Sequence, residues 1–416
     1  MNFSTARIIL AASAGNALEF FDFTVFAYFV PQISDAFFPA HTQTLSLLYT
    51  TGTYATAFLA RPLGALWLGS YADRAGRRAA MTVAIVLMTL GTALVAGMPS
   101  FASIGLLAPL GILLARLLQG FSAGGEFGGA TAFMLEHGSA RRGFMASFQF
   151  ISQSVSSLAG ALVVWITSLT MSAHTLHDWG FRIPFVIGLL IGPVGLYFRR
   201  HAEETPVFQH AIHASRPALD VVEQHPVRVL LAACVVAAGT AGTYIVLYLP
   251  TYAQTQLAMS PSASYALPIL SALVALVVTP LSAMWSDRVG RLMPALLGVT
   301  LLMLAAYPGF WLIPLFPTFA TVTLVAAVLT ALRAFYTAPM PALFGELFPP
   351  ALRGVGMSVS YSLGVLLFGS LTPSVNIWAI HATGLKSFPG IWLATCSVIT
   401  LASLLIIRRR YTLHEE

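Results

Sequence analysis

The stretch GSYADRAGRR, residues 69–78, recurs in the second half of the chain as MWSDRVGR, residues 284–291. Four positions repeat at a constant offset of 214 residues, which pairs Asp73 with Asp287, Arg74 with Arg288, Gly76 with Gly290 and Arg77 with Arg291. A second echo, at offsets of 210 to 211, links Glu136, Arg142 and Gly143 with Glu346, Arg353 and Gly354. The sequence is therefore composed of two parallel repeats.

The repeats are built from apolar segments. Of the 416 residues, 57% are hydrophobic and 9% are charged, whereas a soluble domain carries about 25% charged residues. Disordered chains are also excluded, because they are poor in apolar residues. A spanning helix needs about 20 apolar residues, and twelve apolar runs occur, at 8–30, 46–70, 79–98, 104–135, 144–168, 181–198, 227–253, 263–284, 292–313, 318–341, 354–377 and 388–407.

This spacing predicts an all-α polytopic membrane protein with twelve transmembrane helices. We expect two six-helix bundles, residues 1–198 and 227–416, joined by a polar cytoplasmic linker at 199–226. With the N-terminus inside, 16 Lys and Arg residues fall in cytoplasmic loops and termini and 2 fall outside, Arg182 and Lys386. Positive charge marks cytoplasmic loops, so both termini are predicted to be cytoplasmic. Paired parallel repeats indicate a transporter with its substrate site near the midplane.

Other classes of protein lack support in the sequence. The basic residues lie in loops between spans, so the net charge of +6 does not indicate nucleic-acid binding. Cys234 and Cys396 lie inside apolar runs and form neither a disulfide framework nor a metal site. No H-E-x-x-H, P-loop or G-x-S-x-G motif indicates an enzyme, and no selectivity filter indicates a channel. We expect no catalytic residues, no metal, no cofactor and a monomer in the lipid bilayer.

Six ionisable side chains fall within spans, where burying a charge costs several kcal/mol unless it is paired or hydrated. Glu19 and Asp22 lie at i and i+3 on one helix face near the midplane. Two neighbouring carboxylates at low dielectric do not both ionise easily, so we expect one of them to carry a coupling proton. Glu126 lies among glycines that allow close helix approach, either as a second proton site or as the partner of an arginine.

Arg61 and Arg333 are the candidates for binding an anion, because a guanidinium offers planar, bidentate donors to a carboxylate. Arg61 has an alternative structural role beside Pro62. Polar and aromatic residues that could complete the pocket, or serve helix packing instead, are Asn16, Tyr49, Gln153, Tyr244, Tyr248, Tyr336 and Asn376.

The repeated loops are interpreted as cytoplasmic gates, in which an aspartate caps a helix and pairs with basic residues of the other half. The alternative is that they anchor the topology of the chain. The predicted gate residues are Asp73, Arg74, Gly76, Arg77, Glu136, Arg142, Asp287, Arg288, Arg291, Glu346 and Arg353.

Together with the twelve spans, the repeated D-R-x-G-R loop resembles the major facilitator superfamily. Within it, GNALEFFDF (15–23), FLARPLGA (58–65), RLLQGFSAGGEFGGA (116–130) and WGFRIPF (179–185) resemble the metabolite:proton symporters. The stretches most similar to the citrate and tricarballylate carriers are FFPAHTQTLSLL (37–48), GLLAPLGILLARLLQGFSAG (105–124), FGSLTP (368–373) and KSFPGIWL (386–393).

This resemblance implies a secondary active transporter in the bacterial inner membrane, which imports a small di- or tricarboxylate with protons by alternating access. It also gives Arg116 a role in proton transfer, through the carboxylate of Asp22 or Glu19. The alternative substrates are a zwitterion, proline or betaine, and an aromatic or shikimate-type monocarboxylate. Three arginines within spans argue against a cationic ligand.

Overall fold

The computed structural model describes residues 16–17, 19–75, 77–124, 127–128, 131, 134–135, 141–200, 221, 223–349 and 352–411, with the side chains at 69–70, 72–75, 77–78, 81, 173, 191 and 194–200 left out. The described residues form helices and connecting loops, without a strand. Each of the twelve predicted apolar ranges contains a helix, which confirms the all-α fold.

The first half contains a helix over 19–28 and a series of helices after it: α2 (Val30–Phe37), α3 (Gln43–Ala75), α4 (Arg77–Gly97), α5 (Phe101–Ile104), α6 (Leu107–Ala123), α8 (Arg142–Thr170), α9 (Ala173–Asp178), the 3-10 turn η1 (Gly180–Arg182) and α10 (Ile183–Arg200). The second half contains α13 (Pro226–Leu257), α14 (Pro261–Val289), α15 (Leu292–Leu315), α16 (Phe319–Thr337), α17 (Met340–Leu347), α18 (Arg353–Gly364), the π-helical segment η3 (Val365–Ser370), α19 (Thr372–Thr383) and α20 (Phe388–Arg410).

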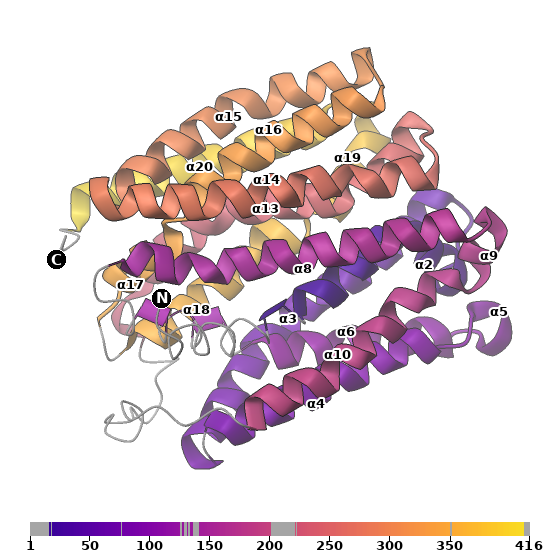
Figure 1. Cartoon of the computed structure of the whole chain (residues 1–416), viewed down its shortest axis with the longest axis horizontal. Coiled ribbons are helices and arrows are strands. Elements are labelled where there is room, and N and C mark those ends of the chain that lie inside the picture. The colour runs from indigo at the N-terminus through magenta and orange to yellow at the C-terminus, as the bar shows by residue number, and fades with distance from the viewer. Residues whose placement is uncertain are drawn as a thin grey trace.

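The two halves lie against each other along their length. In Figure 1, α13 to α16 and α20 occupy the upper part of the molecule and α3, α4, α6 and α10 the lower part, and α8 of the first half packs against α14 of the second. Helix α3 makes further contacts across the boundary with α18, η3 and α19. Residues on α3, α8, α13, α14 and α18 can therefore face a shared space between the halves.

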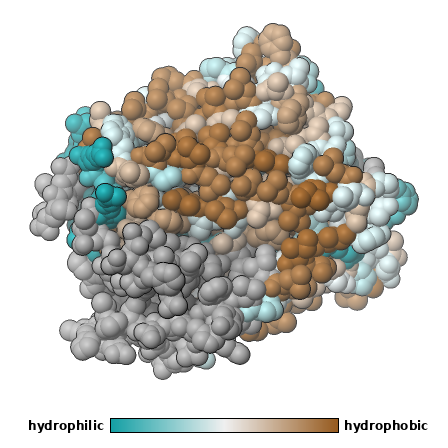
Figure 2. All heavy atoms as spheres, viewed as in Figure 1, coloured by the Kyte–Doolittle hydropathy of each residue, from teal (hydrophilic) through white to brown (hydrophobic). Residues whose placement is uncertain are grey.

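Many large apolar side chains are exposed on the outside of the bundle. Figure 2 shows a broad hydrophobic face, with hydrophilic residues gathered toward two opposite ends. Among the described residues, seven helical stretches are long and apolar enough to cross a membrane. The shorter apolar helices are Thr82–Gly97, Leu107–Ala123 and Gly180–Leu190. A hydrophobic belt between polar ends is the surface that a multi-pass membrane protein requires.

Small residues bring α3 and α6 close together. A Cβ atom at Gly120 would collide with the carbonyl oxygen of Ala57, and one at Gly64 would collide with that of Phe121. Only a residue without a Cβ fits at such backbone contacts. This close packing holds Arg61 on α3 and Arg116 on α6 in the same region of the first half.

Candidate functional site

Asp22 is at the centre of a buried polar cluster in the first half. Its carboxylate accepts hydrogen bonds from Arg116 Nη2 at 2.9 Å, Gln119 Nε2 at 2.6 Å and Thr92 Oγ1 at 2.8 Å. These donors come from α4 and α6, and Arg116 is 0% exposed. Burying either ion alone in hydrocarbon would cost free energy, and the attraction between the two opposite charges offsets part of that cost. The structure thus pairs Arg116 with Asp22, one of the two carboxylates, Asp22 or Glu19, through which the resemblance implied a role for it in proton transfer.

Aromatic rings surround the arginine of this pair. The Arg116 guanidinium lies over the Phe26 ring, 4.2 Å from its centroid, and 5.6 Å from the centroid of Phe23. The negative face of an aromatic ring attracts a cation, so these rings stabilise the Arg116 guanidinium in addition to its ion pair with Asp22.

Glu19, one helical turn before Asp22, forms a second buried ion pair with Arg61 on α3. The Arg61 guanidinium also lies over the Phe58 ring, 4.7 Å from its centroid. Although the sequence places the two carboxylates on one helix face, the structure gives each its own arginine. Glu19 and Asp22 border a cavity inside the first half, together with Thr92 on α4.

Arg61 borders a different cavity, which lies between the two halves. The first half contributes Phe20, Arg61, Phe150 and Gln153 to its wall, and the second half contributes Thr243, Tyr244, Arg333 and Tyr361 among others. One arginine therefore approaches this space from each half of the molecule. The predicted pocket residues Gln153 and Tyr244 border it as well.

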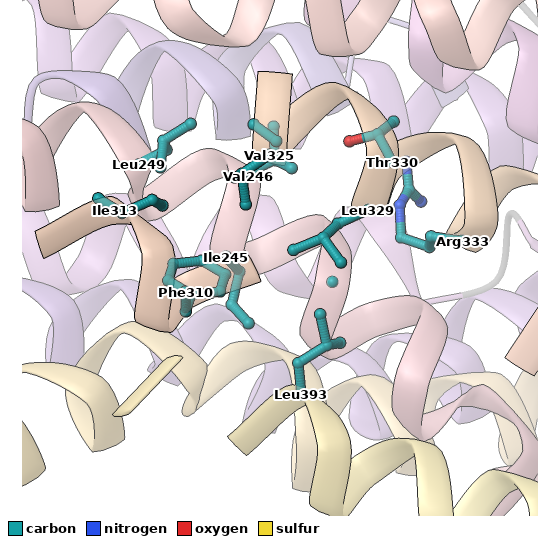
Figure 3. A pocket seen from close by; sticks show the side chains of 12 residues that line it. Ile245, Val246, Leu249, Phe310, Ile313, Val325, Leu329, Thr330, Arg333 and Leu393 are labelled. Atoms are coloured by element: carbon teal, nitrogen blue, oxygen red, sulfur yellow. The ribbon is translucent and has the colours of Figure 1, made fainter. Parts of the chain in front are cut away.

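Arg333 on α16 is held by neutral groups. Its Nη1 donates a hydrogen bond of 2.8 Å to Thr243 Oγ1 on α13, and its buried Nε has no described partner. Among the described residues, no carboxylate lies within ion-pair distance of it. Figure 3 shows that Arg333 also borders an apolar pocket within the second half, beside Leu329 and Thr330. A guanidinium in such surroundings favours an anionic partner.

Two other residues that were predicted to line the pocket, Asn16 and Tyr336, do not border the cavity between the halves. Asn16 bonds to the Gln149 carbonyl at 2.9 Å and to Ser152 at 2.8 Å on α8. Tyr336 donates to the Val235 carbonyl at 2.5 Å, and so joins α16 to α13.

Three more of these candidates are absent from the wall of the inter-half cavity. Tyr248 borders a small neighbouring pocket with Tyr54, and Asn376 donates within α19 to the Thr372 carbonyl at 2.8 Å. Tyr49 is 52% exposed, because its position on α3 faces outward.

Sequence reasoning missed four neutral residues of the site. Gln119 and Thr92 complete the Asp22 cluster, whereas Thr243 and Tyr361 border the inter-half cavity. A signal existed for Gln119, which lies three residues after Arg116 and therefore on the same helix face. Threonines and tyrosines are too frequent in these helices for their identity alone to mark the others.

At one end of the molecule, Asp287 joins the two halves. Its carboxylate accepts the backbone N–H groups of Gly143 at 2.8 Å and Phe144 at 2.9 Å, at the start of α8. It also accepts from Arg291 at 2.5 Å, and Arg291 in turn donates to Glu346 at 3.3 Å. An aspartate of the second half thus caps a helix of the first half, where the partial positive charge of the helix end favours it.

The other predicted gate residues have different positions. Arg353 donates to the Gly345 carbonyl at 2.7 Å, and Arg142 and Arg288 are exposed near the same end of the molecule. Outside the described residues or side chains lie Asp73, Arg74, Gly76, Arg77 and Glu136, together with the proton-site candidate Glu126.

Neutral hydrogen bonds join the halves toward the opposite end. Tyr265 on α14 donates to Gln32 Oε1 on α2 at 2.9 Å, and Ser374 on α19 donates to Thr51 on α3 at 2.8 Å. Tyr265 and Asp287 are near opposite ends of α14, about 33 Å apart at 1.5 Å per residue. Contacts between the halves are therefore present on both sides of the cavity.

The comparisons with known proteins agree with this architecture. The Major Facilitator Superfamily profile matches residues 12–373. A solved structure of a D-xylose-proton symporter superposes with a TM-score of 0.80 at 18% identity and covers 99% of both chains. The chain belongs to the Major Facilitator Superfamily, and it is a transporter rather than an enzyme.

Curated relatives match over nearly the full length. A citrate-proton symporter from Salmonella typhi is 36% identical over 405 residues, which cover 96% of this chain and 93% of the relative. One from Klebsiella pneumoniae is 35% identical over 412 residues, covering 97% and 93%. A proline/betaine transporter from Salmonella typhimurium is 32% identical over 414 residues, covering 95% of this chain and 82% of the relative.

Proposed function

We propose that this protein imports a small organic anion with two or three carboxylates, similar to citrate or tricarballylate, together with protons. The observation that carries the proposal is the pair of arginines, Arg61 and Arg333, which border one cavity from opposite halves. A ligand with two carboxylates can bind one guanidinium of each half. Its binding would then stabilise the state in which the two halves are closed around it.

The charge of the described spanning residues supports an anionic ligand. Arg116 is paired with Asp22 and Arg61 with Glu19, whereas Arg333 has a hydroxyl as its hydrogen-bond partner. A substrate carboxylate beside Arg333 would give this buried charge a counter-ion. A zwitterion such as proline has one carboxylate to share between two arginines, and its cationic group would meet positive charge.

The names of the relatives also support an anionic substrate. The two citrate-proton symporters have higher identity to this chain than the proline/betaine transporter does. Import of a compatible solute such as proline or betaine is the alternative that these comparisons support less strongly. We propose that import is coupled to protons, with the Asp22–Arg116 pair as the proton site and Glu19 and Glu126 as further candidates.

We also propose how the chain lies in the membrane. Residues 1–198 and 227–416 form the two bundles, the linker 199–226 and both termini are cytoplasmic, and the protein is a monomer in the bacterial inner membrane. The distribution of Lys and Arg between the loops supports this orientation. Asp287, with Arg291 and Glu346, would then form the cytoplasmic gate of an alternating-access cycle.

The test is uptake by the full chain reconstituted in proteoliposomes with an imposed pH gradient, acid outside. Labelled citrate, tricarballylate, 2-oxoglutarate and proline are compared, with empty liposomes as the control. We expect accumulation of at least one polycarboxylate above its outside concentration, and its collapse when a protonophore removes the gradient. Accumulation of proline, with no uptake or binding of any polycarboxylate, would overturn the proposal.

A further inference from the structure

The Glu19–Arg61 ion pair lies between two cavities. Arg61 borders the cavity between the halves, whereas Glu19 borders the one inside the first half. Among the described residues, Arg61 is the one basic side chain within ion-pair distance of Glu19. A carboxylate therefore already holds the arginine that borders the proposed substrate site, and that carboxylate borders the other cavity.

We propose that Glu19 is an internal competitor of the substrate for Arg61: a substrate carboxylate displaces it, and the released Glu19 carboxylate takes up a proton. This inference rests on the proposed function, because it requires an anionic substrate at Arg61. It assigns Glu19 a role distinct from that of Asp22, whose arginine does not border the cavity between the halves.

The surroundings of Glu19 determine the consequence of its displacement. The charged groups near it are Arg61 on α3, Asp22 on its own helix and Arg116 on α6, which is bonded to Asp22. The cavity wall from α4 and α10 contains no titratable side chain in the described part of the chain: it consists of Ile85, Met88, Thr89, Thr92, Gly188 and Gly192. The α8 residues near the preceding turn, Gln149, Ser152 and Ser156, are also neutral.

Without Arg61, the Glu19 carboxylate would be a buried charge one turn from the negative Asp22. An uncompensated buried ion costs several kcal/mol, and such a group neutralises instead. A proton from water on the open side of the carrier would bind a carboxylate oxygen of Glu19 and leave it neutral. The Phe58 ring would stay against Arg61 while its anion is exchanged.

Binding of substrate and of this proton then become mutually dependent. By linkage, a ligand whose binding takes up a proton must itself bind more tightly as the pH falls. The dependence approaches a factor of ten per pH unit for one proton, in addition to any titration of the ligand itself. Each substrate carboxylate that binds Arg61 would bring one proton, apart from any proton at Asp22.

Glu19→Gln tests this in the purified full chain, because glutamine is a neutral isostere of the protonated acid. The affinity for citrate and for tricarballylate is measured by titration calorimetry at about pH 6.5 and about pH 8.5. We expect the variant to bind about as tightly as wild type at the lower pH, and more tightly at the higher pH, by up to roughly a hundredfold across the two pH units. We expect the affinity of the variant to fall less steeply with rising pH than that of wild type, the difference being up to roughly a factor of ten per pH unit. Calorimetry in buffers of different ionisation enthalpy should show one fewer proton taken up on binding.

Two further variants support the interpretation. Glu19→Asp keeps the carboxylate and should retain the pH dependence of wild type. Asp35→Asn removes an exposed carboxylate that lies 3.1 Å from His177, and it should also retain this dependence. Ligand titration is the same for every variant and cancels from the comparison. A Glu19→Gln protein with a normal thermal unfolding transition, but with wild-type affinity and pH dependence or with no binding, would overturn the inference. Failure of wild type itself to bind any polycarboxylate would instead overturn the proposed function.

Discussion

Arg333 and Thr243 are joined by a hydrogen bond of 2.8 Å beside the cavity between the halves. A neutral hydroxyl is a weaker partner for a guanidinium than a carboxylate is. We therefore expect Arg333→Ala to weaken the binding of citrate or tricarballylate by roughly 2–5 kcal/mol, because one ligand carboxylate would remain buried without a partner. Calorimetric titration of the purified protein measures this loss.

Arg228→Ala provides the matched control. Arg228 also binds a neutral group, the Leu347 carbonyl at 3.1 Å, but it does not border the cavity. Its replacement should leave affinity unchanged. Arg333→Lys should recover part of the loss, since it restores the charge but not the bidentate geometry. Unchanged carboxylate affinity in Arg333→Ala would assign Arg333 to helix packing.

Asp22→Asn is expected to abolish accumulation driven by a proton gradient. The amide cannot exchange a proton at this site, although its single oxygen can still accept a hydrogen bond from Thr92 or from Gln119, which bond to different oxygens of Asp22. Exchange of labelled for unlabelled substrate should continue, since it needs no net proton movement. Both activities are measured in the same proteoliposomes.

Asp35→Asn is the control for this variant. Asp35 on α2 is exposed and lies 3.1 Å from His177, far from the buried pairs. It should accumulate substrate as wild type does. If Asp22→Asn accumulates substrate at the wild-type rate, the coupling proton binds elsewhere.

The gate contact of Asp287 predicts a separation between binding and transport. Asp287→Asn removes the charge from the hydrogen bonds that cap α8, and hydrogen bonds to charged groups are worth about 1.5–3 kcal/mol each. We expect slower coupled uptake with unchanged substrate affinity, because Asp287 does not border the cavity. Glu223→Gln, at an exposed position before α13, should change neither quantity. Loss of binding in a folded Asp287→Asn protein would contradict a gate role.

The backbone contact at Gly120 predicts a loss of stability. A Cβ at this position would collide with the Ala57 carbonyl, and overpacking of this kind costs about 1–3 kcal/mol. Gly120→Ala should therefore lower the thermal unfolding temperature of the purified protein. Gly52→Ala on α3 is the matched control, because its Cβ would meet no atom within 4 Å. Equal unfolding temperatures for the two variants would show that α3 and α6 can separate at little cost.

The sequence was sufficient for those parts of the site that are governed by the cost of charge in a membrane. Charged side chains within a membrane need counter-ions, and the structure joins Glu19, Asp22, Arg61 and Arg116 in two ion pairs. The all-α fold followed from apolar runs of spanning length. The choice of partner did not follow, because Glu19 and Asp22 share one helix face and either could have faced either arginine.

Neutral residues were harder to predict, since a hydroxyl or an amide can be satisfied within its own helix. Thr243 bonds to Arg333, but it also donates to its own helix at the Gly239 carbonyl, at 2.9 Å. Asn16 bonds to Gln149 and Ser152 on α8. Such choices depend on the packing of distant helices, which the local sequence does not encode.

The two closures of the inter-half cavity differ in strength. The described contacts at Gln32–Tyr265 and Thr51–Ser374 are neutral hydrogen bonds, worth about 0.5–1.5 kcal/mol each, whereas the cap provided by Asp287 is ionic. Thermal fluctuation should therefore separate the neutral side more often than the ionic side. With the orientation proposed above, the empty carrier would spend most of its time open to the periplasm. An importer with this bias would expose its substrate site to the external solution without a separate signal.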